Sequence, residues 1–155
     1  MKNSVLINFI NLTSNEKEMV LAWRNHPNIK RWMYTQEDIS LENHLNFIKS
    51  LENNNEKLYF LVKKEDEYIG VIDFTNITTN KAEIGLYAKP SLRGVGSVLM
   101  ESIIDYGFNV LKVDALISEV FEHNESAIRL YEKFDFKETS RRENIIVMEL
   151  KNENR

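Results

Sequence analysis

The sequence of 155 residues contains no cysteine, and this absence excludes disulfide bonds, thiolate catalysis and zinc sites built from cysteine. Its three histidines are scattered without the HxxxH spacing of a metal site, so we predict no metal. No stretch is apolar over the length that a bilayer-spanning helix needs, and the N-terminal stretch is too short and too polar for a signal peptide. We therefore expect a cytoplasmic protein.

The chain also lacks an excess of positive charge, with a formal net charge of −4 and an isoelectric point near 5.5. It has no overall positive field that would attract nucleic acid or an anionic membrane, and we expect neither partner. The sequence has no internal repeat, linker or low-complexity tract, and its length suits one domain with a buried core. We predict a single domain over residues 1–150 and a polar tail over 151–155, in a monomer or a homodimer.

Hydrophobic spacing predicts an α/β (α+β) fold with a mixed, mostly antiparallel central sheet of about seven strands, flanked by about four helices. The expected strands lie at 5–10, 58–63, 68–74, 82–88, 115–121, 136–139 and 145–150, and the expected helices at 13–23, 40–51, 94–108 and 124–134. A helix joins strands 82–88 and 115–121, so these two should be the parallel pair. Segment 28–38 is expected to be irregular, yet its Trp32, Met33 and Tyr34 indicate that it covers something.

Gly94 and Gly96 stand at the start of the third expected helix. Unpaired backbone N–H groups and the positive end of the helix dipole face outward there, which favours a bound phosphate. Position 99 is Leu and no GK[ST] follows, so the turn is neither the dinucleotide fingerprint nor a P-loop. A structural turn would also explain two glycines, but the preceding strand and the amphipathic helix favour a pyrophosphate site beside a strand edge that can hold an extended chain.

Two motifs in the second half, RGVG and VFEHNESAIRLYEKFDF, resemble the GCN5-related N-acetyltransferase (GNAT) family. The family has Gln or Arg three residues before the first glycine, whereas this chain has Ser91 there and Arg93 directly before Gly94. The resemblance implies a GNAT-like domain that uses acetyl-CoA. It places the cofactor on the backbone of Arg93, Gly94, Val95, Gly96 and Ser97, along Leu86, Tyr87 and Ala88, and against Asn124.

The same resemblance places Tyr131 near the cofactor sulfur, where a phenol is a suitable general acid for the departing thiolate. Tyr131 could instead be helix core, because apolar residues flank it. Glu83 and Glu119 are the candidates for deprotonating the amine, since each lies on a strand beside the presumed cleft. Either could equally sit on a solvated strand face, and ordered water could take the proton without a direct base.

The first half resembles the N-acetyltransferases of bacterial pseudaminic acid biosynthesis, through WRNHPNIKRWMY, GVIDFTNIT and IGLYAKP together with the helix that carries His44 and Phe47. Those enzymes acetylate the 4-amino group of a UDP-linked 4-amino-4,6-dideoxy-N-acetyl-altrosamine, on the route to flagellin glycosylation. The resemblance therefore implies a small UDP-amino sugar as the acceptor.

Such an acceptor agrees with the residue types of the first half. Arg24 offers a fork for a diphosphate or a uracil carbonyl, and His44 a further donor. The other expected contacts are polar at Thr75, Asn76, Tyr87 and Glu119, and apolar, toward a 6-deoxy sugar, at Met33, Tyr34 and Phe47. Arg24 could instead pair with a surface carboxylate, His44 could be a buried structural histidine, and the aromatic residues could plug the sheet end.

Two other functions stay open from sequence. The acceptor could be a protein N-terminus or a polyamine, although the basic and aromatic segment NIKRWMY favours an anionic one. The chain could also be a catalytically silent module that binds coenzyme A, and the presence of Tyr131 weighs against this.

Overall fold

The computed structural model describes residues 4–152, which fold around one seven-stranded sheet of strand order β1-β2-β3-β4-β5-β7-β6. The strands are β1 (Ser4–Asn8), β2 (Leu58–Lys64), β3 (Glu67–Thr75), β4 (Lys81–Ala88), β5 (Ala115–Phe121), β6 (Lys137–Arg142) and β7 (Ile145–Lys151). Within the described residues the α-helices are α1 (Ser14–Asn25), α2 (Pro27–Lys30), α3 (Leu41–Ser50), α4 (Gly96–Tyr106) and α5 (Glu125–Lys133). The predicted fold class and strand number are confirmed.

Strands β1 to β4 pair antiparallel in chain order. Short turns join β2 to β3 and β3 to β4, whereas the segment with α1, α2 and α3 joins β1 to β2. The β2–β3 turn needs Glu65 and Asp66 in the left-handed region, at φ of 51° and 70°. Along each strand successive side chains point to opposite faces, so Leu61 and Val71 enter one core while Phe60 and Ile72 enter the other. At β2 and β3 both faces of the sheet are therefore buried.

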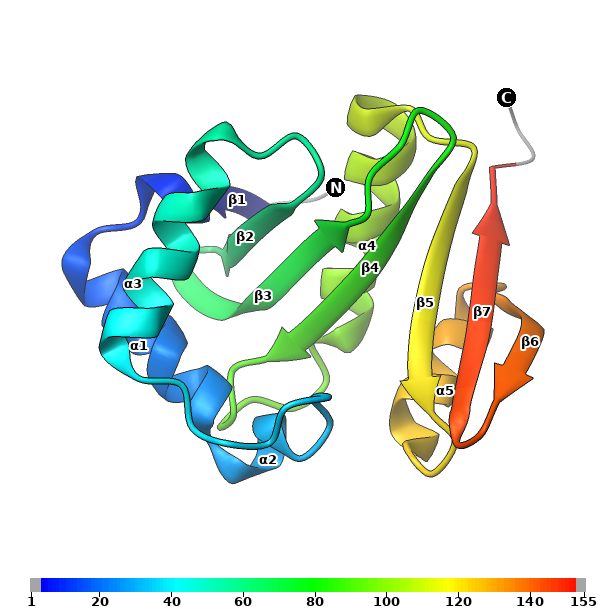
Figure 1. The fold of residues 1–155 in the computed structure, drawn as a ribbon. Helices are drawn as coiled ribbons and strands as arrows, with labels where there is room; N and C mark the ends of the chain where they lie inside the picture. The colour runs from blue at the N-terminus through cyan, green and yellow to red at the C-terminus, as the bar shows by residue number, and fades with distance from the viewer. Residues whose placement is uncertain (1–3, 153–155) are drawn as a thin grey trace.

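The helices divide between these two faces (Figure 1). α1 and α3 cover the first face, where Val20, Trp23 and Ile48 pack. α4 and α5 cover the second, with Leu99 and Ile103 among the fully buried residues. A reciprocal capping box starts α1: the Glu16 amide donates to the Thr13 hydroxyl, and the Thr13 amide donates to the Glu16 carboxylate.

β4 and β5 are the parallel pair, as predicted, and they stay together for only a short length. Register runs from Lys81 opposite Ala115 to Glu83 opposite Ile117, and the strands then diverge toward their carboxyl ends (Figure 1). The second half of β4 thus has β3 on one edge and no strand partner among the described residues on the other.

The structure corrects several boundaries. Pro27–Lys30 is the short helix α2 inside a region expected to be irregular, because Pro suits the first helical position and the His26 ring accepts the Asn28 amide at 3.1 Å. Strand β7 reaches Lys151, one residue into the expected polar tail, and residues 153–155 of that tail lie outside the described range. No helix within 4–152 is long and apolar enough to cross a bilayer.

Candidate active site

A cavity of about 990 Å³ lies where β4 and β5 diverge, and residues from both faces of the sheet line it. From the α4 and α5 face come Gly94, Gly96, Asn124 and Tyr131. The opposite face contributes, among others, Met33, Tyr59, Asp73, Thr75 and Glu83. A ligand held on one face can therefore reach a ligand held on the other through the gap between the two strands.

The start of α4 offers unpaired backbone donors to this cavity. Val95 occupies the N-cap position and makes no side-chain hydrogen bond to the helix, so within residues 4–152 the first amides have no side-chain cap. Gly94 has a φ of +80°, which a residue with a side chain adopts only with strain. A Cβ on Gly96 would come within 3.2 Å of the Leu130 side chain. The predicted phosphate cradle thus has open amides and the positive end of the helix dipole.

Lys133 adds a positive charge at the same place, which the sequence did not lead us to expect. Its ammonium donates to the Ser97 hydroxyl at 2.7 Å, and both residues line the cavity. A cation at this helix start favours a bound pyrophosphate. Arg93 and Val95, by contrast, are not among the lining residues, so their predicted contacts with the cofactor stay predictions.

The open edge of β4 leads from this cradle into the cavity. Leu86, Tyr87 and Ala88 all line the cavity, and they lie beyond Glu83, where pairing with β5 ends. Their backbone donors and acceptors on that edge are free to bind an extended ligand in the manner of an added strand. The predicted cofactor contacts at Gly94, Gly96, Ser97 and Asn124 line the same cavity.

Tyr131 extends from α5 to the region between the two faces. Its side chain is buried, packs against Phe136 with ring centroids 5.3 Å apart, and lines the cavity. Burial raises the pKa of Tyr131 to about 12, and the nearby Asp73 charge adds to this, whereas the Ser118 hydroxyl lowers it. Ser118 approaches the phenol without a well-formed hydrogen bond between described residues. Tyr131 is therefore fully protonated at neutral pH.

Glu119 lines the cavity but is already engaged. Its Oε1 accepts a hydrogen bond from the Tyr34 hydroxyl at 2.5 Å and another from Arg142 at 3.0 Å. These contacts, with Arg142 the stronger, lower the pKa of Glu119, while burial and the Glu119 carboxylate raise the pKa of Tyr34 to about 12. A carboxylate whose ionised form is so well stabilised is a weak base, so the geometry favours a binding role for Glu119 over proton abstraction.

Glu83 is a second carboxylate in the wall of the cavity. Glu83 and Thr75 line it, whereas Asn76 lies behind Glu83 and donates to its Oε2 at 2.7 Å. Asn76 sits in the left-handed region at φ 48°. Its predicted contact with the acceptor would thus be made through Glu83 rather than directly.

Sequence reasoning missed Asp73, which lines the cavity from the middle of β3. Burial, together with the charge of Glu83, raises the pKa of Asp73 to about 7. The sequence does mark Asp73, because it is the one carboxylate in the apolar run GVIDF, just as Glu119 is the one carboxylate in its own strand.

The segment after α2 covers the acceptor side of the cavity. Trp32, Met33 and Tyr34 all line it, as the aromatic content of this segment predicts. Two ring contacts fasten the segment to the end of β5 and its following turn: Trp32 lies 5.3 Å from His123 and Tyr34 lies 5.8 Å from Phe121, between ring centroids.

His44 is not where the resemblance would place it. It is buried between α3 and α1, and its Nε2 lies 2.9 Å from the Lys17 carbonyl oxygen. Burial lowers the pKa of His44, so the ring is neutral at physiological pH. It does not line the cavity, and the alternative of a structural histidine applies.

Phe47 and Arg24 also lie behind the cavity wall. Phe47 packs edge-on against Tyr59, at 5.0 Å between ring centroids, and it is Tyr59 that lines the cavity. Arg24 donates from Nη2 to the Thr35 carbonyl at 2.8 Å, which ties α1 to the covering segment. Its Nη1 is buried and has no hydrogen-bond partner among the described residues.

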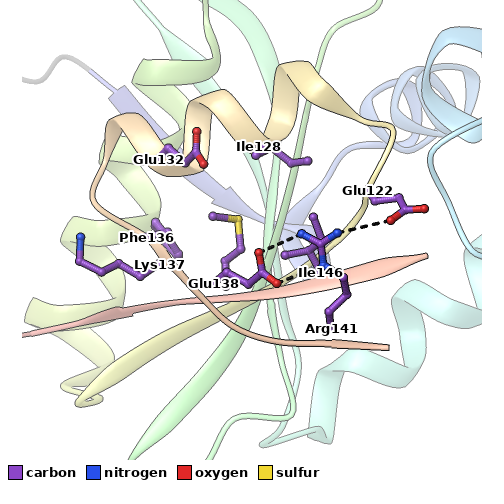
Figure 2. Close-up of a pocket in the computed structure, with 9 residues that line it drawn as sticks. Glu122, Ile128, Glu132, Phe136, Lys137, Glu138, Arg141 and Ile146 are labelled. Atoms are coloured by element: carbon purple, nitrogen blue, oxygen red, sulfur yellow. Dashed lines mark hydrogen bonds and ion pairs between the residues drawn. The ribbon is translucent and has the colours of Figure 1, made fainter. Parts of the chain in front are cut away.

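A smaller cavity of about 590 Å³ lies beneath α5, beside β6 and β7 (Figure 2). Its apolar lining includes Ile128, Phe136 and Ile146. Arg141 donates to Glu138 at 3.0 and 3.1 Å and lies 3.5 Å from Glu122, so its charge is neutralised within the protein. These paired groups offer no chemistry comparable to the larger cavity. Within residues 4–152 no cluster of histidine and carboxylate side chains could hold a metal.

Comparisons with known proteins agree with this geometry. The family model described as "Acetyltransferase (GNAT) domain" matches residues 7–137. Acetyltransferase PseH of Campylobacter jejuni is 50% identical over 131 residues, which cover 84% of this chain and 83% of that protein. The crystal structure of C. jejuni N-acetyltransferase PseH in complex with acetyl coenzyme A superposes with a TM-score of 0.84 at 41% identity, over 96% of this chain and 99% of that one.

A more distant enzyme shares the fold alone. Spermidine N-acetyltransferase of Vibrio cholerae, solved with CoA and spermine, has a TM-score of 0.85 at 19% identity, over 96% of this chain and 95% of that one.

Proposed function

The chain belongs to the GNAT acetyltransferase family, and from this we propose that it acetylates the 4-amino group of a UDP-linked 4-amino-4,6-dideoxy sugar in pseudaminic acid biosynthesis. It is an N-acetyltransferase whose acetyl donor is acetyl-CoA. The observation that carries the proposed acceptor is the 50% identity with PseH over 84% of the chain. We place this reaction in the cytoplasm.

The donor side of the site follows from local structure. We propose that the pyrophosphate lies at the amides of Val95, Gly96 and Ser97, beside the Lys133 ammonium. The pantetheine arm then runs along the open edge of β4, from Ala88 toward Leu86. Acetyl-CoA supplies the thioester carbonyl, and a backbone N–H near Leu86 or Tyr87 is positioned to polarise it.

Tyr131 is the proposed acid of the reaction. It holds a proton at neutral pH and reaches the cavity from the donor face, where the thiolate of coenzyme A departs. General acid catalysis by a positioned side chain contributes about 100-fold to 10,000-fold. A protonated Tyr131 in the cavity favours an enzyme over a module that only binds coenzyme A.

The acceptor side is built from the covering segment and the carboxylates. Met33 and Tyr34 supply apolar surface for a 6-deoxy sugar, while Thr75, Glu83 and Glu119 supply polar groups. Arg24 lies behind the lining residues, and its buried Nη1, which has no partner among the described residues, is the proposed donor to the nucleotide part. The three carboxylates of the cavity, Asp73, Glu83 and Glu119, would also suit a polyamine, so the acceptor has to be tested directly.

The test is release of free thiol from acetyl-CoA with three acceptors at equal concentration: the UDP-4-amino sugar, spermidine and a peptide with a free N-terminus. We expect kcat/KM for the UDP-4-amino sugar to exceed the other two by at least about 100-fold, which corresponds to about 2.7 kcal/mol of discrimination. Turnover with the peptide or with spermidine but none with the sugar nucleotide would refute the proposed acceptor.

Arg24→Ala should raise KM for the UDP-4-amino sugar by roughly 10-fold or more, because a charged hydrogen-bond donor to the nucleotide is lost. The KM for acetyl-CoA should stay within about twofold, since Arg24 lies on the acceptor face. Steady-state kinetics with each substrate varied in turn measures both values. Arg141→Ala is the matched control, because Arg141 lies at the smaller cavity and pairs there with Glu138 and Glu122, so it should leave both KM values unchanged. An unchanged KM for the sugar nucleotide in Arg24→Ala would remove Arg24 from the nucleotide site.

A further inference from the structure

The half-buried carboxyl group of Asp73 lies in the wall of the larger cavity. Asp73 stands opposite Gly85 in the β3–β4 register. A Cβ built on Gly85 would come within 2.6 Å of Asp73 Oδ2, so the carboxyl group lies over Gly85 in the space that a side chain would otherwise fill. Asp73 and Gly85 both line the cavity, at the level where the open edge of β4 begins.

The groups around Asp73 are phenols and another acid. Three elements supply these groups. Burial, and after it the charge of Asp73, raises the pKa of Tyr59 on β2, of Tyr87 on β4 and of Tyr131 on α5, and Glu83 on β4 in turn acts on Asp73. Arg24 of α1 is a cation that acts on Tyr87. Burial and the Glu83 charge both raise the pKa of Asp73, to about 7, and no hydrogen bond from a described residue lowers it. Asp73 thus lacks the partner that a structural carboxylate would have.

The two other carboxylates of the cavity are already committed. Glu119 accepts hydrogen bonds from Tyr34 and Arg142, and Glu83 accepts one from Asn76. Among the lining carboxylates, Asp73 is the one for which no described residue supplies a hydrogen bond or an ion pair, so both of its oxygens can accept from an incoming ammonium. It also shares the cavity with Tyr131, so a base and an acid face the same reacting centre.

We propose that Asp73 is the general base that takes the proton from the acceptor ammonium. This rests on the proposed function, in that the acceptor is a primary amine. The ionised Asp73 accepts one ammonium proton and later releases it to solvent. The neutral nitrogen forms the C–N bond to the thioester carbon, and the C–S bond breaks. Tyr131 gives its phenolic proton to the sulfur, and the second nitrogen proton restores the phenol, so one thiol, one amide and one released proton result.

Asp73→Asn tests this role with little change in shape. At pH 7.5 we expect kcat/KM for the amine to fall about 100-fold, while the Kd of coenzyme A stays within about twofold. Asp66→Asn is the matched control, because Asp66 lies exposed in the turn of the same β2–β3 hairpin. It should behave as the wild type.

The pH profile separates a base from a merely structural residue. A base must be ionised, so wild-type kcat/KM should rise with pH through about 7 and then level. In Asp73→Asn the rise in kcat/KM near pH 7 should be absent. Instead, kcat/KM should increase toward the wild-type value as the pH passes the pKa of the acceptor amine, because the free amine then forms in solution. A wild-type limb that persists in Asp73→Asn, or an equal loss of activity at every pH, would overturn the proposal.

A direct titration needs no substrate. With 13C-labelled aspartate, the carboxyl signal that disappears in Asp73→Asn should titrate near pH 7 in the free protein, and a midpoint near 4 would overturn the proposal. If the wild type acetylates a different amine, the proposed acceptor is wrong but the role of Asp73 is still testable. The kinetic measurements on Asp73→Asn are then made with that amine. A fully active wild type with an equally active Asp73→Asn refutes the base alone.

Discussion

Replacing Tyr131 with Phe is expected to lower kcat by about 100-fold to 1,000-fold, while the Kd for acetyl-CoA changes by less than about threefold. The substitution removes one hydroxyl from a buried ring and keeps the packing on Phe136. Because the proton reaches the sulfur only as the C–S bond breaks, its loss is felt in the transition state and not in the bound ground state. Steady-state turnover and a fluorescence titration with acetyl-CoA in the absence of the acceptor measure the two quantities.

Tyr106→Phe is the matched control for this experiment. Tyr106 packs against Phe60 and Phe74, with ring centroids 4.9 and 5.4 Å apart, and it does not line the cavity. Its loss of a hydroxyl should leave kcat unchanged. If Tyr131→Phe keeps the wild-type kcat as well, Tyr131 is helix core and not the acid.

Ser97→Asp is expected to weaken acetyl-CoA binding by about 100-fold while it stabilises the fold. A carboxylate beside the α4 N-terminus would repel the pyrophosphate, and two like unit charges about 5 Å apart cost about 3 kcal/mol at an effective dielectric constant of 20. The same carboxylate interacts favourably with the helix dipole, which contributes roughly 0.3 to 1 kcal/mol to folding. Isothermal titration with coenzyme A and thermal melting without it measure the two effects.

Ser97→Ala separates the new charge from the lost hydroxyl. It removes the acceptor of the Lys133 hydrogen bond without adding an anion. We expect its coenzyme A affinity to fall by no more than about fivefold. An unchanged affinity in Ser97→Asp would show that the phosphates do not lie at the start of α4.

The fold was predictable wherever hydrophobic spacing alone decides an element. The alternation in strands and the crossover between 82–88 and 115–121 gave the sheet and its parallel pair. α2 was missed because only four residues form it and its start depends on the His26 ring as a cap. The length of β7 depends on pairing with β5, which places Lys151 opposite Ala115.

The donor half of the site was easier to predict than the acceptor half. Its residues are close together in the chain, so Gly94, Gly96 and Ser97 are found as one turn. Asp73 and Lys133 depend on contacts across strands and between helices, with Gly85 and with Ser97 respectively. His44 was misplaced because helical spacing cannot tell whether a polar side chain on an apolar face points to a ligand or to the carbonyl of Lys17.

The divergence of β4 and β5 has a consequence for kinetics and for inhibition. In the proposed reaction, donor and acceptor would bind from opposite faces of one sheet and meet in the gap between the strands. We therefore expect direct transfer of the acetyl group between two ligands held at the same time in a ternary complex, without an acetylated enzyme. A single molecule that joins coenzyme A to the amino sugar through that gap would gain the affinity of both halves.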